Sequence, residues 1–224
     1  MKLSVIIPVY NEKATIEEIL KRVLEVPIEK EIIIVDDGST DGTSEILKKV
    51  PVGVKVVSHG KNLGKGCAVR TGLEHASGDI VIIQDADLEY NPRDYPGLIS
   101  PIQNGHAEVV YGSRNLKGNN PRSGFGFYWG GVFLSKLTNL LYGTRLTDEA
   151  TGYKVFRTEV IKGLDLKSRG FEFCPEVTGK LARRGYRIHE VPISYTPRKK
   201  LEGKKITWKD GITAVYNLIR HRFF

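Results

Sequence analysis

The sequence predicts an α/β fold, with a mostly parallel central sheet, helices on both faces and an amphipathic helix at the C-terminal end. Two observations support this prediction. Short apolar runs alternate with segments of helical periodicity up to residue 84, and this alternation is typical of a parallel sheet. The chain has 224 residues, of which 40% are hydrophobic and 27% are charged, which is ordinary for a soluble globular protein with one core.

The first half of the chain supplies the expected strands and helices in turn. Residues 3–9 (LSVIIPV) form an apolar, β-branched run that indicates a buried parallel strand. Apolar residues then recur at helical spacing over 14–24, with Asn11 as a candidate helix cap. The same patterns predict three further strands, over 31–35, 54–58 and 79–84, and two further helices, over 43–49 and 65–76.

The second half is less regular. A loop rich in Gly, Asn, Pro and Arg over 117–126 leads into an aromatic helix, and another helix is expected over 175–184. Residues 199–205 (KKLEGKK) indicate a basic loop, and 206–224 a final amphipathic helix.

The positive charge of the chain is concentrated at one end. The net charge is +8, from 34 basic and 26 acidic residues. Residues 1–182 hold 23 of each sign, whereas residues 183–224 hold 11 basic and 3 acidic residues. A diffuse basic surface that coats nucleic acid is therefore not expected, and an anionic partner should meet the C-terminal end.

Cysteine content and the start of the chain indicate a cytoplasmic protein of one domain. Cys67 and Cys174 are the two cysteines, too few for a disulfide framework or a metal knuckle. Met1 leads directly into the first strand without a signal-peptide pattern. Because no internal repeat or low-complexity linker interrupts the chain, we expect one domain over 1–200 and a basic helical appendage over 201–224.

An acidic cluster follows the strand expected at 79–84. Asp85 and Asp87 stand two residues apart at the exit of that strand, where alternation would point both side chains the same way, and Glu89 follows two residues later. Carboxylates held this close are costly without a cation between them, and hard oxygen ligands select Mg²⁺ or Mn²⁺. The alternative is a solvated acidic turn.

Polar residues also follow the second expected strand. In the run 36–43 (DDGSTDGT), Asp37 is a candidate to hydrogen-bond a base or a ribose hydroxyl. The alternative is helix capping by Ser39, Thr40 or Asp41. Further on, Gly64, Lys65 and Gly66 suggest a phosphate loop, but their spacing fits neither the P-loop nor the dinucleotide-binding pattern. An ATP-binding or dinucleotide-binding fold is therefore disfavoured.

Taken together, four segments resemble the family 2 glycosyltransferases of the GT-A fold. In order, they are 8–12 (PVYNE), 36–43 (DDGSTDGT), 62–66 (NLGKG) and 85–87 (DAD). The resemblance covers about residues 1–200 and implies an inverting transferase that uses a nucleoside-diphosphate sugar and a divalent metal. The residues that it places at the donor are Pro8, Tyr10, Glu12, Asp37, Lys65 and Asp85.

The same resemblance assigns roles to the acidic cluster. Asp85 would face the ribose or the metal, and Asp87 would bind the metal on the diphosphate. Glu89, the third expected metal ligand, stands where relatives often carry Gln.

Within the family, the second half is similar to dolichol-phosphate mannose synthases and related polyprenyl-phosphate sugar transferases. The matching segments are 112–114 (GSR), 148–154 (DEATGYK), 171–173 (FEF) and the basic loop 198–205. The segment 148–154 departs from the commonest Asp-x-x-Ser-Gly-Phe form, and the QxxRW motif of processive polysaccharide synthases is absent. This similarity implies transfer of mannose from GDP-mannose to a polyprenyl or dolichyl phosphate.

The chemistry of a phosphate acceptor fits the basic residues of the second half. A lipid phosphate is already ionised near neutral pH and needs cationic positioning more than a general base. Arg114 and Arg198 are the candidates to hold it, because guanidinium groups match phosphate oxygens. The alternatives are a surface ion pair for Arg114 and a solvated loop for 198–205. Together with Asp87 and Asp148, these arginines make up the candidate catalytic residues.

Three other functions stay open on the sequence alone. The same fold can use UDP-glucose or another nucleotide sugar. A soluble hydroxyl acceptor is a second alternative, with Asp148 or Glu149 as the general base. The third is a non-catalytic nucleotide-sugar binder.

The final helix has an apolar stripe with basic neighbours. Trp208, Ile212, Val215 and Ile219 recur at helical spacing, with Phe223 one turn on. The flanking basic residues are Lys209, Arg220 and Arg222. We expect peripheral contact with the inner face of the cell membrane through this helix. The alternative is packing on the core or on a second subunit, as in a homodimer.

Overall fold

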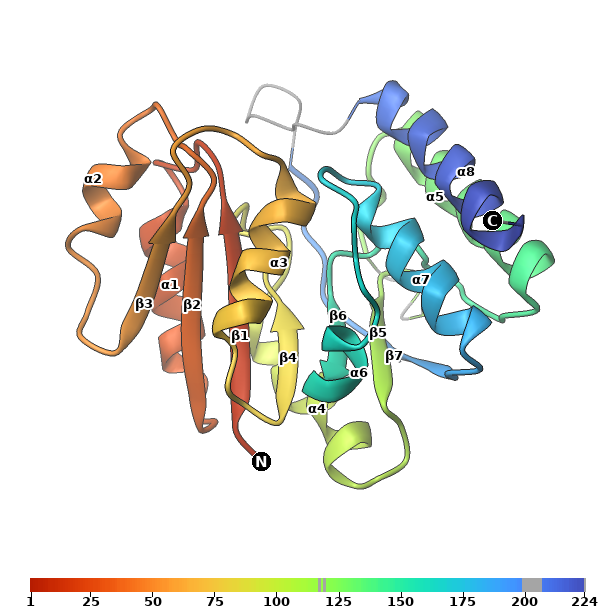
Figure 1. The fold of residues 1–224 in the computed structure, drawn as a ribbon, viewed down its shortest axis with the longest axis horizontal. Coiled ribbons are helices and arrows are strands. Elements are labelled where there is room, and N and C mark those ends of the chain that lie inside the picture. The colour runs from red at the N-terminus through yellow and green to blue at the C-terminus, as the bar shows by residue number, and fades with distance from the viewer. Residues whose placement is uncertain (117, 119, 199–206, 224) are drawn as a thin grey trace.

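The computed structural model describes residues 1–116, 118, 120–198 and 207–223. In this part of the chain, seven strands form one sheet in the order β3-β2-β1-β4-β6-β5-β7 (Figure 1). The strands are β1 (Leu3–Val9), β2 (Lys30–Asp36), β3 (Val54–Ser58), β4 (Ile80–Ile83), β5 (Val109–Ser113), β6 (Lys154–Arg157) and β7 (Ile188–Pro192). The predicted α/β fold with a mostly parallel sheet is confirmed.

The centre of the sheet is parallel and apolar. β1 lies between β2 and β4, with Val5 in register with Ile32 on one side and Ile82 on the other. Six of the seven β1 residues are buried, which explains their nearly continuous apolar run. The carboxyl ends of β1, β2 and β4 therefore meet at one edge.

Helices cover both faces of the sheet. One face packs against α1 (Ile16–Glu25) and α4 (Tyr95–Gln103), and the other against α3 (Lys65–His75), α6 (Thr158–Lys162) and α7 (Phe173–Arg183). Figure 1 shows α3 and α7 in front of the strands and α1 behind them. A short helix, α2 (Thr43–Leu47), follows β2, and a 3-10 turn, η1 (Pro92–Asp94), precedes α4.

The predicted cap of the first helix is wrong. Thr15 occupies the N-cap position of α1. Asn11 instead has a positive φ of 51° in the preceding turn, and its side-chain oxygen accepts a hydrogen bond from the Thr40 backbone N–H at 2.8 Å. Asn11 therefore joins the turns that follow β1 and β2.

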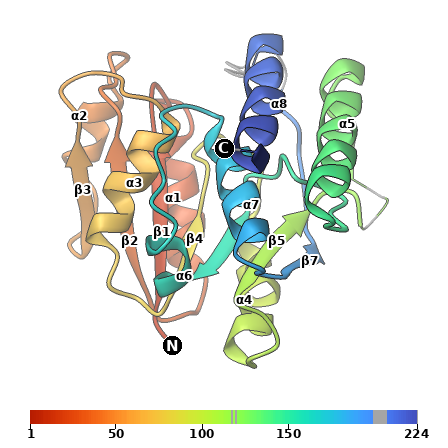
Figure 2. The ribbon, with the colours of Figure 1, turned by 45° about the vertical axis from the view of Figure 1, so that its right-hand side comes forward.

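The second half adds an antiparallel strand. β6 runs antiparallel to both β4 and β5, whereas β5 and β7 are parallel. Two long helices lie beyond it, α5 (Phe125–Tyr142) and α8 (Trp208–Phe223), where the aromatic and C-terminal helices were predicted. They share a small apolar cluster of Leu134 with Ala214 and Leu218, and both views place them side by side (Figure 2).

Candidate functional site

The carboxyl edge of β2 is held by a buried carboxylate. Asp37 accepts hydrogen bonds from the backbone N–H groups of Leu63 at 2.9 Å and Gly64 at 2.8 Å, and one of its oxygens lies 2.7 Å from Nδ1 of His59. These contacts fix the loop before α3 to the end of β2. Asp37 therefore lies at the carboxyl edge of the sheet and also fixes the position of the neighbouring loop.

The glycines of the 62–66 segment allow a close backbone approach. A Cβ atom at Gly64 would collide with the Arg169 carbonyl group, and one at Gly66 with that of Ser168. Gly64 also has a φ of +100°, which favours glycine. The two glycines thus serve the packing of α3 on the segment before α7.

Lys65 begins α3 and reaches the acidic cluster. Its Nζ lies 2.5 Å from Oδ1 of Asp85, and its ammonium group faces the Phe171 ring at 5.9 Å from the centroid. Burial alone would lower the pKa of Lys65, but the charges of Asp85 and Asp87 and the hydrogen bond to Asp85 act together against it, and the pKa of Lys65 is raised. Lys65 is therefore a fixed positive charge beside Asp85.

The acidic cluster needs more positive charge than Lys65 provides. β4 ends at Ile83, so Asp85 and Asp87 lie in the loop beyond the strand and do not alternate along it. Burial, together with the charges of Asp85 and Glu89, raises the pKa of Asp87 to about 7. Crowded carboxylates of this kind suit a hard divalent cation. The residues present therefore fit Mg²⁺ or Mn²⁺.

The described residues do not by themselves complete a metal site. No group of three or more His, Cys, Asp or Glu side chains within them is arranged to hold an ion. Glu89 contacts other partners, accepting hydrogen bonds from the Arg198 backbone N–H at 2.7 Å and from the Tyr195 hydroxyl at 3.3 Å. Phosphate oxygens of a substrate would have to supply the remaining ligands.

A second charged pair flanks this cluster. Arg114 follows β5, and its Nε and one terminal nitrogen each donate to the Asp148 carboxylate at 2.7 Å. Asp148 is 2% exposed, so this is a buried, bidentate pair rather than the surface pair considered from the sequence. The guanidinium group also lies over the Tyr195 ring, 5.2 Å from its centroid.

Arg198 joins both halves of the site. Its guanidinium group donates to the two carboxylate oxygens of Glu12 at 3.1 and 2.6 Å, and its backbone N–H binds Glu89. Arg198 therefore links the acidic cluster to the turn after β1. Residues 199–205 of the expected basic loop, including Lys204 and Lys205, lie outside the described residues.

Comparison with known proteins decides the family. Residues 4–164 match the family described as glycosyl transferase family 2. The chain belongs to this family.

Curated relatives within the family are similar over nearly the whole chain. A protein of Pyrococcus furiosus named dolichol-phosphate mannosyltransferase is 34% identical over 98% of this chain, and the chain spans 64% of that relative's length. A Micrococcus luteus protein named undecaprenyl-phosphate mannosyltransferase is 32% identical, with 98% of this chain and 93% of the relative covered.

Solved structures share the fold. Glucosyl-3-phosphoglycerate synthase from Mycobacterium tuberculosis, in complex with Mn²⁺, UDP and phosphoglyceric acid, superposes with a TM-score of 0.74 at 22% identity. The match covers 100% of this chain and 79% of the synthase chain. The expected GT-A architecture of this family 2 glycosyltransferase is thereby confirmed.

Every donor-site residue predicted from the sequence lies at the carboxyl edge of the sheet or next to it. Pro8 is the last but one residue of β1, and Tyr10 and Glu12 follow in the turn. Among these, Glu12 is buried and ion-paired with Arg198. The fold thus brings together residues from five separate segments of the sequence: 8–12, 37, 62–66, 85–89 and 198.

Two residues of this family 2 site make contacts that the sequence patterns did not reveal. Tyr195 contacts both Arg114 and Glu89. Gly152 lies so close to Asp85 that a Cβ atom there would collide with its carboxylate. Neither residue sits in a motif with its partners, because these contacts join segments far apart in the sequence.

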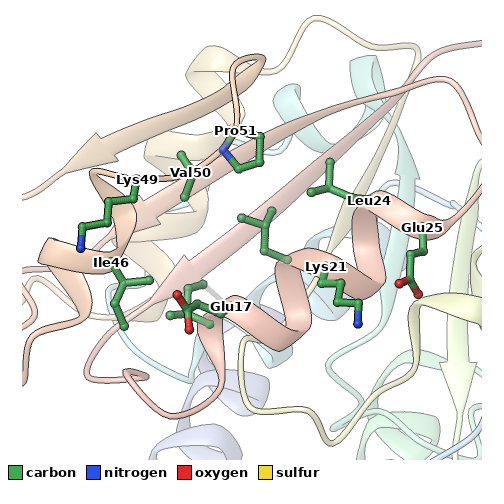
Figure 3. Close-up of a pocket in the computed structure, with 10 residues that line it drawn as sticks. Glu17, Lys21, Leu24, Glu25, Ile46, Lys49, Val50 and Pro51 are labelled. Carbon is green, nitrogen blue, oxygen red and sulfur yellow. The ribbon is translucent and has the colours of Figure 1, made fainter.

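A groove on another part of the molecule is separate from the site. It lies between α1 and α2 (Figure 3). Its walls are the aliphatic side chains of Leu20, Leu24 and Ile46, with Lys21 and Lys49 at the edge. None of the predicted donor or acceptor residues lines it.

Proposed function

We propose that this glycosyltransferase moves mannose from GDP-mannose to a polyprenyl phosphate, with inversion at the anomeric carbon. One observation carries the proposal. At one edge of the sheet, a cluster of carboxylates that requires a cation lies near two guanidinium groups, those of Arg114 and Arg198, each fixed by an ion pair. The names of the P. furiosus and M. luteus relatives support the mannosyl donor and the lipid phosphate acceptor.

The donor would lie along the carboxyl ends of β1, β2 and β4. The nucleoside would lie beside Pro8, Tyr10, Glu12 and Asp37, which stand at or just beyond the ends of β1 and β2. The diphosphate would reach Asp87 and its neighbours, which would hold a divalent ion and leave phosphate oxygens to complete its coordination. The bound ion would stabilise negative charge on the departing nucleoside diphosphate.

The acceptor phosphate would be positioned by the arginines. Its oxygen forms the new bond to the anomeric carbon while the bond to the donor diphosphate breaks, and the nucleoside diphosphate leaves. An ionised phosphate gives up no proton in this step, so no general base is required. Rate enhancement then comes from positioning and from charge stabilisation.

The environment of the two candidate bases favours this reading over a hydroxyl acceptor. Both oxygens of Asp148 are occupied by Arg114. Glu149 is fully buried, and burial raises its pKa. Neither carboxylate is placed to remove a proton from a substrate that binds at the edge of the sheet.

A donor panel tests the proposal. GDP-mannose, GDP-glucose, UDP-glucose and UDP-N-acetylglucosamine, each labelled in the sugar, would be incubated with a short polyprenyl phosphate and Mg²⁺ or Mn²⁺ in detergent. We expect organic-phase label from GDP-mannose, its loss in Asp87→Asn, and full activity in Asp165→Asn, whose side chain is 78% exposed. Label that enters only a soluble sugar acceptor would overturn the proposal.

A lipid acceptor also implies contact with a membrane. No helix in the described ranges is both long and apolar enough to span a bilayer. We propose peripheral association at the inner face of the cell membrane, with α8 as one contact.

A further inference from the structure

The side chain of Asn120 binds the backbone of Arg114. Its amide nitrogen donates to the carbonyl oxygens of Arg114 and Ile193, each at 2.8 Å. Its side-chain oxygen accepts a hydrogen bond from the Tyr195 backbone N–H at 3.1 Å. An asparagine side chain has two N–H donors and one acceptor oxygen, so these three contacts engage all of its polar groups. Asn120 therefore fixes the loop after β5 to the segment after β7.

Glu190 supports Arg114 by a second route, through the segment that carries Asp148. Glu190 lies on β7. Its carboxylate accepts hydrogen bonds from the backbone N–H groups of Thr147 at 2.8 Å and Asp148 at 3.0 Å, and from the Thr147 hydroxyl at 2.9 Å. Asp148 in turn accepts hydrogen bonds from the backbone N–H and the guanidinium group of Arg114. Glu190 therefore fixes the backbone of the residue whose side chain directs Arg114.

Both routes end at Arg114. One holds its carbonyl group, and the other holds its carboxylate partner. We infer that Asn120 and Glu190 are positioning residues that orient the Arg114 guanidinium group toward the acceptor phosphate, an inference that rests on the proposed function. Guanidinium groups bind phosphate through N–H donors in a fixed planar arrangement, so their direction decides how well they bind.

The fold itself is built from other contacts. β5 and β7 pair in parallel through their backbone groups, with Tyr111 in register with Glu190 (Figure 2). Apolar side chains form the core on both faces of the sheet. Asn120 and Glu190 are each only half-buried. Replacing either side chain should therefore leave the sheet and the core in place and change the position of Arg114.

The order of the strands separates this effect from donor binding. β7 is the last strand of the sheet, and β5, which leads into Arg114, lies next to it. The expected donor residues follow β1, β2 and β4, and the sheet places β6 and β5 between β4 and β7. A change at Glu190 should therefore affect the acceptor and spare the donor.

Steady-state kinetics in detergent test the route through Glu190, with GDP-mannose, farnesyl phosphate and Mn²⁺. Glu190→Gln keeps the size of the side chain but replaces one oxygen with an NH₂ group, which cannot accept a hydrogen bond. We expect the KM for farnesyl phosphate to rise about tenfold and the KM for GDP-mannose to change less than about twofold. Glu108→Gln is the matched control, because Glu108 is exposed and precedes the other end of β5. It should retain both wild-type KM values.

Asn120→Asp tests the other route. Aspartate has nearly the same shape but no N–H donors, so both hydrogen bonds to the carbonyl groups are lost. We expect the KM for farnesyl phosphate to rise about tenfold here as well. Asn104→Asp, at an exposed position after α4, should not change it. If Glu190→Gln does not fold, Thr147→Val removes only the hydroxyl that donates to Glu190 and should raise the same KM severalfold.

Combination with Arg114→Met distinguishes positioning from a general effect on the structure. Once the guanidinium group is absent, Asn120 and Glu190 have nothing to orient. Neither change should then raise the KM for farnesyl phosphate any further. An unchanged KM in the single variants would overturn the inference. So would equal increases in the KM of donor and acceptor, or an acceptor effect that persists in the Arg114→Met background.

Titration calorimetry with farnesyl phosphate needs no donor, so it separates this inference from the proposed function. We expect Glu190→Gln and Asn120→Asp each to weaken binding about tenfold. Wild-type affinity in both variants, or no binding by the wild-type chain, would overturn the inference. Binding that depends on both residues, without lipid-linked product from any donor, would refute the proposed transfer alone.

Discussion

Replacing Asp148 with Asn tests whether this residue acts as a base or as a support for Arg114. The carboxylate is 2% exposed and binds the guanidinium group through two hydrogen bonds of 2.7 Å. Removing one charge of a buried pair costs about 3–5 kcal/mol. About a fifth of the Arg114 side chain reaches solvent, and Asn keeps one acceptor oxygen, so we expect a loss of about 2 kcal/mol in the free energy of unfolding.

A double-mutant cycle isolates the contribution of the pair. Asp148→Asn, Arg114→Met and the double variant would be unfolded in urea and followed by far-ultraviolet circular dichroism, since both tryptophans lie at the surface. We expect the double variant to be destabilised by less than the sum of the two single changes, because Arg114→Met removes the charge that Asp148→Asn leaves unpaired.

Kinetics on the same variants separate the two roles. If Asp148 acts through Arg114, the double variant should transfer sugar to the lipid phosphate no more slowly than Arg114→Met alone. A general base contributes about 10²–10⁴-fold to the rate. Strictly additive rate losses, together with unchanged stability of Asp148→Asn, would refute the supporting role and restore the hydroxyl-acceptor mechanism.

Three further predictions follow from the geometry of the site. The Asp87 pKa of about 7 lies above the ordinary value, so the metal-free native state holds an extra proton, and its stability should fall as pH rises from about 4 to 7. Titration calorimetry should show that the affinity for Mn²⁺ increases as the pH rises through 7, and that Mn²⁺ binding releases a proton. Tyr195→Phe removes the hydroxyl that binds Glu89 and should weaken Mn²⁺ binding severalfold in electron paramagnetic resonance titrations, whereas unchanged affinity would show that this contact is dispensable. Gly152→Ala should lower donor affinity more than tenfold, because its Cβ collides with the neighbouring carboxylate, whereas Gly97→Ala, with open space around it, should not.

The first half of the fold could be predicted because its signals are local. The parallel strands β1, β2 and β4 are short apolar runs, and apolar residues recur at helical spacing in the segments between them. The second half lacks such signals. β6 has four residues and includes Lys154, a fully buried lysine whose ammonium group donates to the Glu149 carbonyl at 2.6 Å. A lysine in so short a segment gives no indication of a central strand.

The site could be predicted where chemistry is concentrated in short motifs, and not where it depends on packing. Asp85 and Asp87 follow a strand directly, so their position was evident from the sequence. The pairing of Arg114 with Asp148 joins residues 34 positions apart, and that of Arg198 with Glu12 joins residues 186 positions apart. Such pairs form only when the strands that carry them become neighbours in the sheet. The order of the strands depends on long-range contacts, which short sequence motifs do not reveal.

The ion pairs at the site are compatible with phosphate binding because of the number of donors that each cation carries. A guanidinium group has five N–H donors and an ammonium group three. The two side-chain hydrogen bonds from Arg114 to Asp148 engage only part of the guanidinium donor set. The ion pair of Lys65 with Asp85 likewise engages part of the ammonium group. Each carboxylate therefore fixes the direction of its cation, while the donors beyond the pair would offer the phosphate of the proposed substrates a site that is oriented before binding.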